Sequence, residues 1–314
     1  LGGQSPLRVV NELYEVGSRS TGGLVLYDLT SSYMEGTTCP LAPYGHHRDG
    51  KRDKPQVNYG LITDARGCPV AVSVFDGNVA DTKTIAPQVT RVRDTFGIRE
   101  VVLVGDRGMI SDRAITDFRE HDGLAWVTAL KTGQIRTLLE GGHLQLGLFD
   151  ERNLFELRHP DHRDERLIAC RNPELATRRA YRRQELLEAT ERELTKVQRA
   201  VEAGRLHARD QIGLRAGRVI NKYNVAKHFA LTIEDRRFTF TRRQARIDLE
   251  ASLDGISLIR TNVPAKRMSA KDAVRNDKAL SQVERAFRSL KTIDLHVRPI
   301  PHRTADRARS HILL

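Results

Sequence analysis

The chain has 314 residues, of which 39% are hydrophobic and 29% are charged, and its net charge is +12. This apolar fraction excludes a disordered chain, and no apolar run reaches the roughly 20 residues that a membrane-spanning helix needs. The positive charge favours a polyanion such as nucleic acid as the large partner. The alternative is a solvated basic surface with no partner, since net charge alone speaks to solubility and association.

The spacing of the cysteines indicates a cellular compartment, and the two chain ends indicate whether the sequence is part of a longer protein. Cys39, Cys68 and Cys170 lie far apart and form no CxxC pair, so we expect neither a zinc ribbon nor a disulfide framework, and a reducing cytoplasm fits best. The chain begins at Leu1 without a methionine and ends on an apolar Ile-Leu-Leu, so both ends are expected to be cut from a longer protein.

Three strands are predicted near the start of the chain. In the first, Gly23–Thr30, alternation of side chains places Asp28 at the end of an apolar face. A turn with the turn formers Asp64 and Gly67 joins the next two strands, so the three should form an antiparallel meander. These two strands are Gln56–Thr63 and Pro69–Phe75.

A helix is predicted after this meander. Asp81 or Thr84 could cap it, and Gly97 should end it. Asn78 and Asp81 could instead position the first strand, although the cap is favoured. The apolar spacing predicts a buried helical stripe at Ile85, Val89, Val92 and Phe96.

A second aspartate follows the fourth predicted strand. That strand, Val101–Val104, runs into a Gly-containing turn with Asp106. Ser111 should cap the next helix, and a further strand follows at Leu124–Leu130, where Trp126 is interpreted as core rather than as a base-stacking platform. The element order is therefore three strands, helix, strand, helix, strand.

A long helix dominates residues 131–260. Asn172 as cap, Pro173 at the first helical position and Gly204 after the end bracket roughly 30 residues. A seven-residue apolar repeat occurs at Ala180, Leu187, Leu194 and Val201. Positive charge loads the first half at Arg178, Arg179, Arg182 and Arg183. A coiled-coil-like arm and a helix packed on its own domain with a solvated arginine face both fit this pattern.

The last part of the chain is expected to contain a strand, Gly255–Arg260, and a helix, Ala270–Lys291. Glu284, Arg288 and Lys291 are spaced by four and three residues, so a carboxylate and two cations share one ridge of this helix. A neighbouring buried stripe is predicted at Leu280, Val283, Phe287 and Leu290.

Three carboxylates from separate elements could form one metal site. Two-metal phosphodiester cleavage needs hard oxygen ligands that hold two Mg²⁺ ions roughly 3.5 to 4 Å apart. Asp28 and Asp106 would lie side by side if their strands pair in parallel, and Glu284 would approach from the last helix. Taken singly, each has another reading: a strand-end aspartate, a tight turn and a salt-bridged helix face. His46 and His47 are adjacent and are interpreted as loop residues rather than metal ligands.

Six stretches of sequence are specific as a set. Three surround the acids, at Leu26–Ser31, Val102–Met109 and Val283–Lys291, and three lie between them, at Tyr44–Asp49, Gln56–Leu61 and Phe75–Asp81. This set resembles the DDE transposases of bacterial insertion sequences, specifically the insertion-sequence-four type and its close relatives. The resemblance covers about residues 24–130 and 252–310.

The resemblance implies a ribonuclease H-like α/β fold, with a mixed sheet flanked by helices, and a transposase that cleaves DNA ends and joins them to target DNA. Asp28, Asp106 and Glu284 would be the catalytic residues and the ligands of two Mg²⁺ ions, for which Mn²⁺ can substitute. The expected DNA contacts are Arg107, Lys278, Arg285, Arg288 and Lys291.

The family signature around the glutamate is only half present. Glu284 and Lys291 match it, whereas its arginine position is Leu280 and its tyrosine position is Asp277. We expect Arg288 or Lys278 to supply the missing cation.

The resemblance also implies domains and partners. Residues 1–22 would be an N-terminal remnant or linker, 23–130 and 252–314 the core with a truncated C-terminus, and 131–251 an insertion with its long helix at about 173–203. A sequence-specific DNA-binding domain is expected upstream of Leu1. The expected partners are double-stranded DNA, as inverted-repeat ends and target, and a second copy in a dimeric DNA complex, within the cytoplasm at a bacterial nucleoid.

Two other functions stay open at this point. The first is a DNA-binding remnant that no longer catalyses, which would accord with the departures at Asp277 and Leu280. The second is a ribonuclease H-like nuclease that cuts DNA without joining it.

Overall fold

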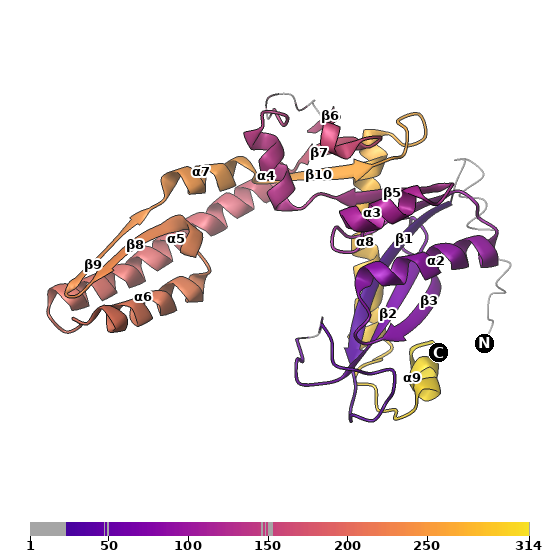
Figure 1. Ribbon diagram of the computed structural model, residues 1–314, viewed down its shortest axis with the longest axis horizontal. Coiled ribbons are helices and arrows are strands. Elements are labelled where there is room, and N and C mark those ends of the chain that lie inside the picture. The colour runs from indigo at the N-terminus through magenta and orange to yellow at the C-terminus, as the bar shows by residue number, and fades with distance from the viewer. Residues whose placement is uncertain are drawn as a thin grey trace. The chain divides into compact units, whose positions relative to one another are not determined.

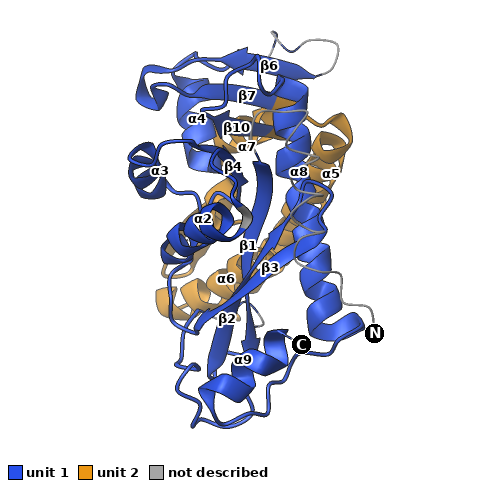
Figure 2. Ribbon diagram, turned by 90° about the vertical axis from the view of Figure 1, so that its right-hand side faces the viewer, with its two compact units in different colours: residues 1–169, 257–314 blue, residues 170–256 orange. Residues whose placement is uncertain are grey.

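The computed structural model describes residues 23–46, 48, 50–145, 147, 149 and 153–313. Predictions for residues 1–22, His47 and Asp49 lie outside the described residues. The chain divides into two compact units, which are residues 1–169 with 257–314 (unit 1) and residues 170–256 (unit 2), coloured separately in Figure 2. None of the helices in the described part of the chain has the length and apolar character of a membrane span.

A mixed eight-stranded sheet organises unit 1 (Figure 1), in the order β3-β2-β1-β4-β5-β10-β7-β6. The first three strands in the chain pair antiparallel as predicted, whereas β1, β4 and β5 pair in parallel. The predicted α/β fold class and the element order are therefore confirmed. The strands are β1 Gly23–Tyr33, β2 Gln56–Thr63, β3 Pro69–Asp76, β4 Val101–Val104, β5 Leu124–Ala129, β6 Leu154–Leu157, β7 Arg166–Arg171 and β10 Ile256–Thr261.

Helices α2 (Asp81–Phe96) and α3 (Asp112–Arg119) pack on one face of this sheet. The Ser111 side chain caps α3 by accepting a hydrogen bond from the backbone N–H of Ala114, as predicted. The side chains that form this core include Val25 and Tyr27 of β1, Ile85, Val89 and Val92 of α2, Ile115 and Phe118 of α3, and Trp126 of β5. The predicted stripe of α2 and the core assignment of the tryptophan are confirmed for the side chains that the structure describes.

The predicted side-chain cap of α2 is wrong. The residue at the cap position is Ala80, and no side chain makes a capping hydrogen bond there. The Asp81 carboxylate instead forms an ion pair with the Arg48 guanidinium, and the Thr84 hydroxyl donates to the Asp81 carbonyl oxygen over 2.6 Å. Gly97 ends the helix in the left-handed conformation, as predicted, with φ of 68°.

Helix α8 (Ala270–Arg288) packs on the opposite face of the sheet, against β1, β4 and β5. The helix is shorter than predicted, because a π-helical turn, η4 (Ser289–Ile293), follows Arg288; α9 (Ala305–Leu313) comes last. Val283 and Phe287 of the predicted stripe are buried, whereas Leu280 and Leu290 are half-buried.

The segment after β5 continues the sheet of unit 1. Residues 131–169 were assigned to the insertion from sequence, whereas the structure places α4 (Thr132–Glu140), β6 and η2 (Pro160–His162) in unit 1. The reason is strand pairing, because β10 lies between β5 and β7 and so carries the sheet onward. The inserted domain at 131–251 stays a prediction.

Unit 2 has its own hydrophobic core, formed by one side of the long helix α5 (Pro173–Glu202) with its neighbours. The Asn172 side chain caps α5 by accepting from the backbone N–H of Leu175. Leu187, Leu194 and Val201 of the predicted repeat are buried in this core, so the interpretation of a helix packed on its own domain is confirmed. The other elements are α6 Arg209–Tyr223, η3 Ala226–His228, β8 Phe229–Glu234, β9 Arg237–Arg242 and α7 Gln244–Ser252.

Candidate active site

Parallel pairing of β1 with β4 brings the two predicted aspartates to equivalent positions. The last registered pair is Leu26 with Val104, and Asp28 and Asp106 each follow two residues later. The prediction that Asp28 ends its strand is wrong, because β1 continues to Tyr33 along its antiparallel partner β2. Asp28 nevertheless lies where β4 stops, at the carboxyl edge where ligands of α/β sheets bind.

The register of β1 and β2 also tells which way Asp28 points. Asp28 lies opposite Leu61 and Thr30 opposite Tyr59, and residues directly opposite in an antiparallel pair share a face. The Tyr59 ring meets Phe287 of α8 edge-on, with ring centroids 5.9 Å apart. Asp28 therefore faces α8, where Glu284 lies one helical turn before Phe287.

Electrostatics links the three predicted acids. The pKa of Asp28 is raised to about 6, first by burial, and the charges of Asp106 and Glu284 raise it further. The backbone N–H of Leu29 donates to Asp28 Oδ1 over 2.8 Å, and this bond together with the Arg48 charge opposes the rise. The fold thus gathers three negative charges. The Asp28 side chain is half-buried, whereas those of Asp106 and Glu284 are exposed.

A fourth carboxylate, Asp277, borders this cluster from the first half of α8. Burial raises its pKa to about 6, the Asp106 charge raises it further, and Lys278 and Arg107 oppose the rise. Asp277 and Glu284 are seven residues apart, so they lie on one ridge of the helix about 10 Å from each other. The sequence indicated Asp277 only as a departure from the family signature, and its proximity to Asp106 follows from the packing of α8.

Arg48 is a functional candidate that the sequence analysis passed over in favour of the neighbouring histidines. Its guanidinium pairs with Asp81, and its backbone N–H donates to the Ser31 hydroxyl of β1 over 3.3 Å. The signal that could have found it is the motif Tyr44–Asp49, which contains it. Arg48 and Gly108, which is two residues after Asp106, line a cavity of about 390 Å³.

The predicted DNA contacts divide into exposed and buried side chains. Lys291 is buried, 8% exposed, and lies in the π-helical turn rather than on α8. The other four side chains are exposed. Arg107 follows Asp106, and Lys278, Arg285 and Arg288 lie on α8. The prediction that Glu284 and Lys291 share one ridge of α8 is therefore wrong, because Lys291 lies beyond the end of that helix.

The donor set fits a hard divalent cation in type and in charge. Carboxylate oxygens are the ligands that Mg²⁺ prefers, and the pKa of Asp28, which burial raises first, is raised further by the negative charges of Asp106 and Glu284. In the described ranges, no three His, Cys, Asp or Glu side chains lie close enough together to hold one metal ion. The three carboxylates thus lie within electrostatic reach of one another, without a shared coordination geometry.

Comparison with known proteins identifies the family of the chain. The family model described as "Transposase DDE domain" matches residues 20–314. No curated protein matches the chain significantly. Two solved structures have limited similarity to it. A piggyBac transposase synaptic complex with hairpin DNA has a TM-score of 0.31 at 12% identity, over 54% of this chain and 36% of that chain. A Mos1 transposase paired-end complex with left transposon end has a TM-score of 0.24 at 12% identity, over 44% of this chain and 47% of that chain. The chain therefore covers less than half of either protein.

Proposed function

Because the chain belongs to the Transposase DDE domain family, we propose that it is a transposase that cleaves the ends of an insertion sequence and joins them to target DNA. Within the family we assign it to the insertion-sequence-four type, on the sequence motifs around the three acids. The observation that carries the proposal is the equivalent placement of Asp28 and Asp106 on parallel strands, with Glu284 on the helix that covers them. The partner is double-stranded DNA, bound in a dimeric complex at a bacterial nucleoid.

In this proposal Asp28, Asp106 and Glu284 hold two Mg²⁺ ions, for which Mn²⁺ can substitute. When bound, the metal ions activate the attacking oxygen and stabilise the leaving oxygen of a phosphodiester. The chain orients the ligands: Asp106 Oδ1 accepts from the backbone N–H of Gly108 over 2.9 Å, and Asp28 Oδ1 from that of Leu29. Arg48 favours the ionised form of Asp28, in which the carboxylate is the better metal ligand.

DNA phosphates would meet the exposed cations around the acids. Arg107 follows Asp106 directly, and Arg285 and Arg288 lie one and four residues after Glu284 on α8. Guanidinium groups suit phosphate oxygens because they present planar pairs of N–H donors. Lys278 adds a further charge beside Asp277, whereas Lys291 remains in the proposal only through its match to the family signature.

The test uses the purified chain and labelled duplexes that carry the terminal inverted repeats flanking its own coding sequence. With Mg²⁺, we expect end cleavage and joining to a target plasmid. Asp28→Asn, Asp106→Asn and Glu284→Gln should each lower cleavage at least about a hundredfold while duplex binding persists. Asp117→Asn, an exposed change on α3, is the matched control and should cut like the wild type.

Three other outcomes would contradict the proposed site or favour a different function. Undiminished cutting by Asp28→Asn contradicts the assignment of the site. Binding without cutting by the wild type favours the DNA-binding remnant. Cutting without joining favours a ribonuclease H-like nuclease.

A further inference from the structure

The two halves of helix α5 differ in what surrounds them. Its buried side chains all lie from the middle of the helix onward, beginning with Leu187. The first half instead exposes four side chains that we name the arginine patch: Arg178, Arg179, Tyr181 and Arg182. Tyr181 is 66% exposed, which is unusual for so large a ring. The core of unit 2 therefore does not account for this part of the helix.

Helix geometry separates the patch from the one arginine that stabilises the fold. Arg183 forms a bidentate ion pair with Asp254, and both side chains are about nine-tenths buried, 11% and 10% exposed. At about 100° per residue, Leu187 lies roughly 180° around the helix from Arg178. Arg178, Tyr181 and Arg182 occupy an arc of about 100° on that far side. These three side chains thus face away from the core, Arg179 lies on the side of the helix about 80° from Leu187, and Arg183 faces towards the core.

The charges of the patch are not neutralised locally. Within the described ranges, Arg178, Arg179 and Arg182 form no ion pair within 4.0 Å. Glu185, three residues after Arg182, instead acts on the Tyr181 hydroxyl and raises the pKa of that group through hydrogen bonding. Three guanidinium groups within five residues are therefore available to an anionic partner.

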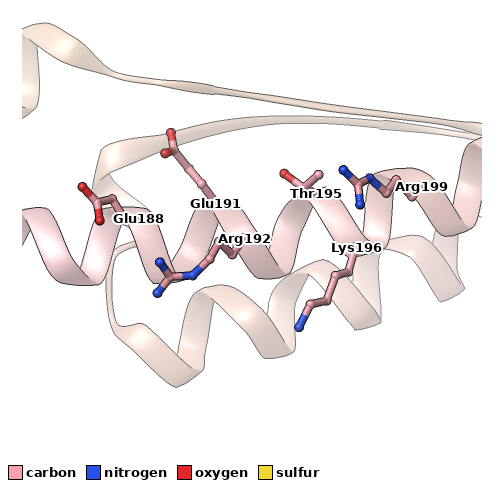
Figure 3. Close-up of a pocket in the computed structure, with 6 residues that line it drawn as sticks. All are labelled: Glu188, Glu191, Arg192, Thr195, Lys196 and Arg199. Atoms are coloured by element: carbon pink, nitrogen blue, oxygen red, sulfur yellow. The ribbon is translucent and has the colours of Figure 1, made fainter.

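The second half of α5 is charged as well, but there acids accompany the cations (Figure 3). Glu188, Glu191, Arg192, Thr195, Lys196 and Arg199 line a shallow pocket on this half. Lys196 Nζ lies 2.6 Å from Glu193 Oε1, and Arg242 of β9 makes two hydrogen bonds of 2.6 Å to Glu191. The contrast identifies the first half as the unbalanced one.

We propose that the arginine patch is a second DNA-binding surface, which binds phosphates of duplex DNA separately from the carboxylate site. The identity of the polyanion rests on the proposed function, which makes duplex DNA the partner of this chain. Unit 2 as a whole carries 19 Lys and Arg against 12 Asp and Glu, a net charge of +7. Arginine suits the role because it binds two phosphate oxygens at once, and the tyrosine ring can lie against the sugar-phosphate backbone.

The test is equilibrium binding of the full chain to a labelled duplex of about 30 bp across a salt series. The triple variant Arg178→Gln/Arg179→Gln/Arg182→Gln should bind at least about tenfold more weakly near 0.1 M salt. Its slope of log affinity against log salt should fall by roughly 0.9 for each phosphate that the variant no longer neutralises. Triple replacement by lysine keeps the charge and should retain most of the affinity.

The matched control is Arg192→Gln/Lys196→Gln/Arg199→Gln, which removes the same charge from the same helix and should weaken binding less than about threefold. Equal weakening of both variants, or wild-type binding by the patch variant, would overturn the proposal. Circular dichroism checks that α5 is intact; if the triple variant unfolds, the three single variants decide by their individual salt slopes.

Failure of this inference differs from failure of the proposed function. If no preparation cleaves DNA ends but duplex binding still depends on the patch, the proposed transposase function is refuted and the proposed DNA-binding role of the patch stands. Normal cleavage by a patch variant with unchanged binding refutes only the patch.

Discussion

Asp28 and Asp106 occupy equivalent positions on two parallel strands, each two residues beyond the last registered pair, Leu26 with Val104. Because β4 stops at Val104 while β1 continues, Asp106 lies in a loop and Asp28 within a strand. Two carboxylates from such different backbone environments thus share one edge of the sheet.

Metal ions should stabilise the wild type through these acids. Millimolar Mg²⁺ should raise the thermal unfolding temperature, because a cation that binds only the folded state stabilises it by mass action. Asp106→Asn removes one ligand and should lose most of this shift, as measured by differential scanning fluorimetry. Asp117→Asn on α3 is the control and should keep the shift. An equal shift in both variants would place the metal elsewhere.

Arg48 should set the pH at which the metal effect is lost. The Arg48 charge lowers the pKa of Asp28, which burial has raised to about 6. Arg48→Gln therefore raises the pKa of Asp28 further, so that its carboxylate protonates at a higher pH than in the wild type. The Mg²⁺-induced stabilisation, measured from pH 5 to 8, should accordingly disappear at a higher pH in the variant. A midpoint that stays in place or moves down contradicts this coupling.

Asp277 should make the metal-free fold less stable as the pH rises. Its pKa is about 6 in the folded chain against an ordinary value of 3.8, so the folded state binds more protons than the unfolded state between these values. Stability from this group is therefore complete below about pH 4 and is lost as the pH rises through 6. Asp277→Asn should be roughly 1–3 kcal/mol more stable than the wild type at pH 7.5 and nearly equal at pH 4. Urea denaturation at both pH values checks the sign.

The buried ion pair of Arg260 and Glu165 should be costly to break from one side. Arg260 Nε and Nη2 donate to Glu165 over 2.6 and 2.8 Å, and the residues are 6% and 2% exposed. Arg260→Met leaves the buried Glu165 carboxylate with only the 45% exposed Arg119, 3.1 Å away, as an arginine partner, and should cost up to about 3–5 kcal/mol in urea denaturation. Arg260→Met with Glu165→Leu should recover much of that loss. Asp112→Asn, which removes a 70% exposed partner of Arg260, is the control and should cost under about 1 kcal/mol.

Phe287 should anchor the helix that carries Glu284. Its ring is 5% exposed and packs edge-on against Tyr59 of β2. Phe287→Ala should cost about 3–5 kcal/mol of unfolding free energy, and it should also lower DNA cleavage because α8 is held less firmly over the acids. Phe287→Leu should cost clearly less. Leu295→Ala, at a site 59% exposed, is the control and should change neither quantity.

Several elements were predictable because their causes are local. Period-two alternation and the turn residues Asp64 and Gly67 predicted the β-meander, and Ser111 and Asn172 predicted two helix starts by their side-chain caps. The cap of α2 was mispredicted, because the Asp81 carboxylate is taken by Arg48, a residue 33 positions away. Local preference is a sound guide only where no distant partner competes for the same group.

The sequence by itself determined the element order, an aspartate in the first strand and another just after the fourth, and the phase of α8 that turns Phe287 inward. These depend on side-chain periodicity and on turn chemistry, which neighbours along the chain decide. Only the tertiary structure decided that Asp277 lies within electrostatic reach of Asp106, that Lys291 is buried, and that β7 and β6 extend the sheet beyond β10. Such relations join residues that are far apart along the chain, and strand pairing and helix packing bring them together.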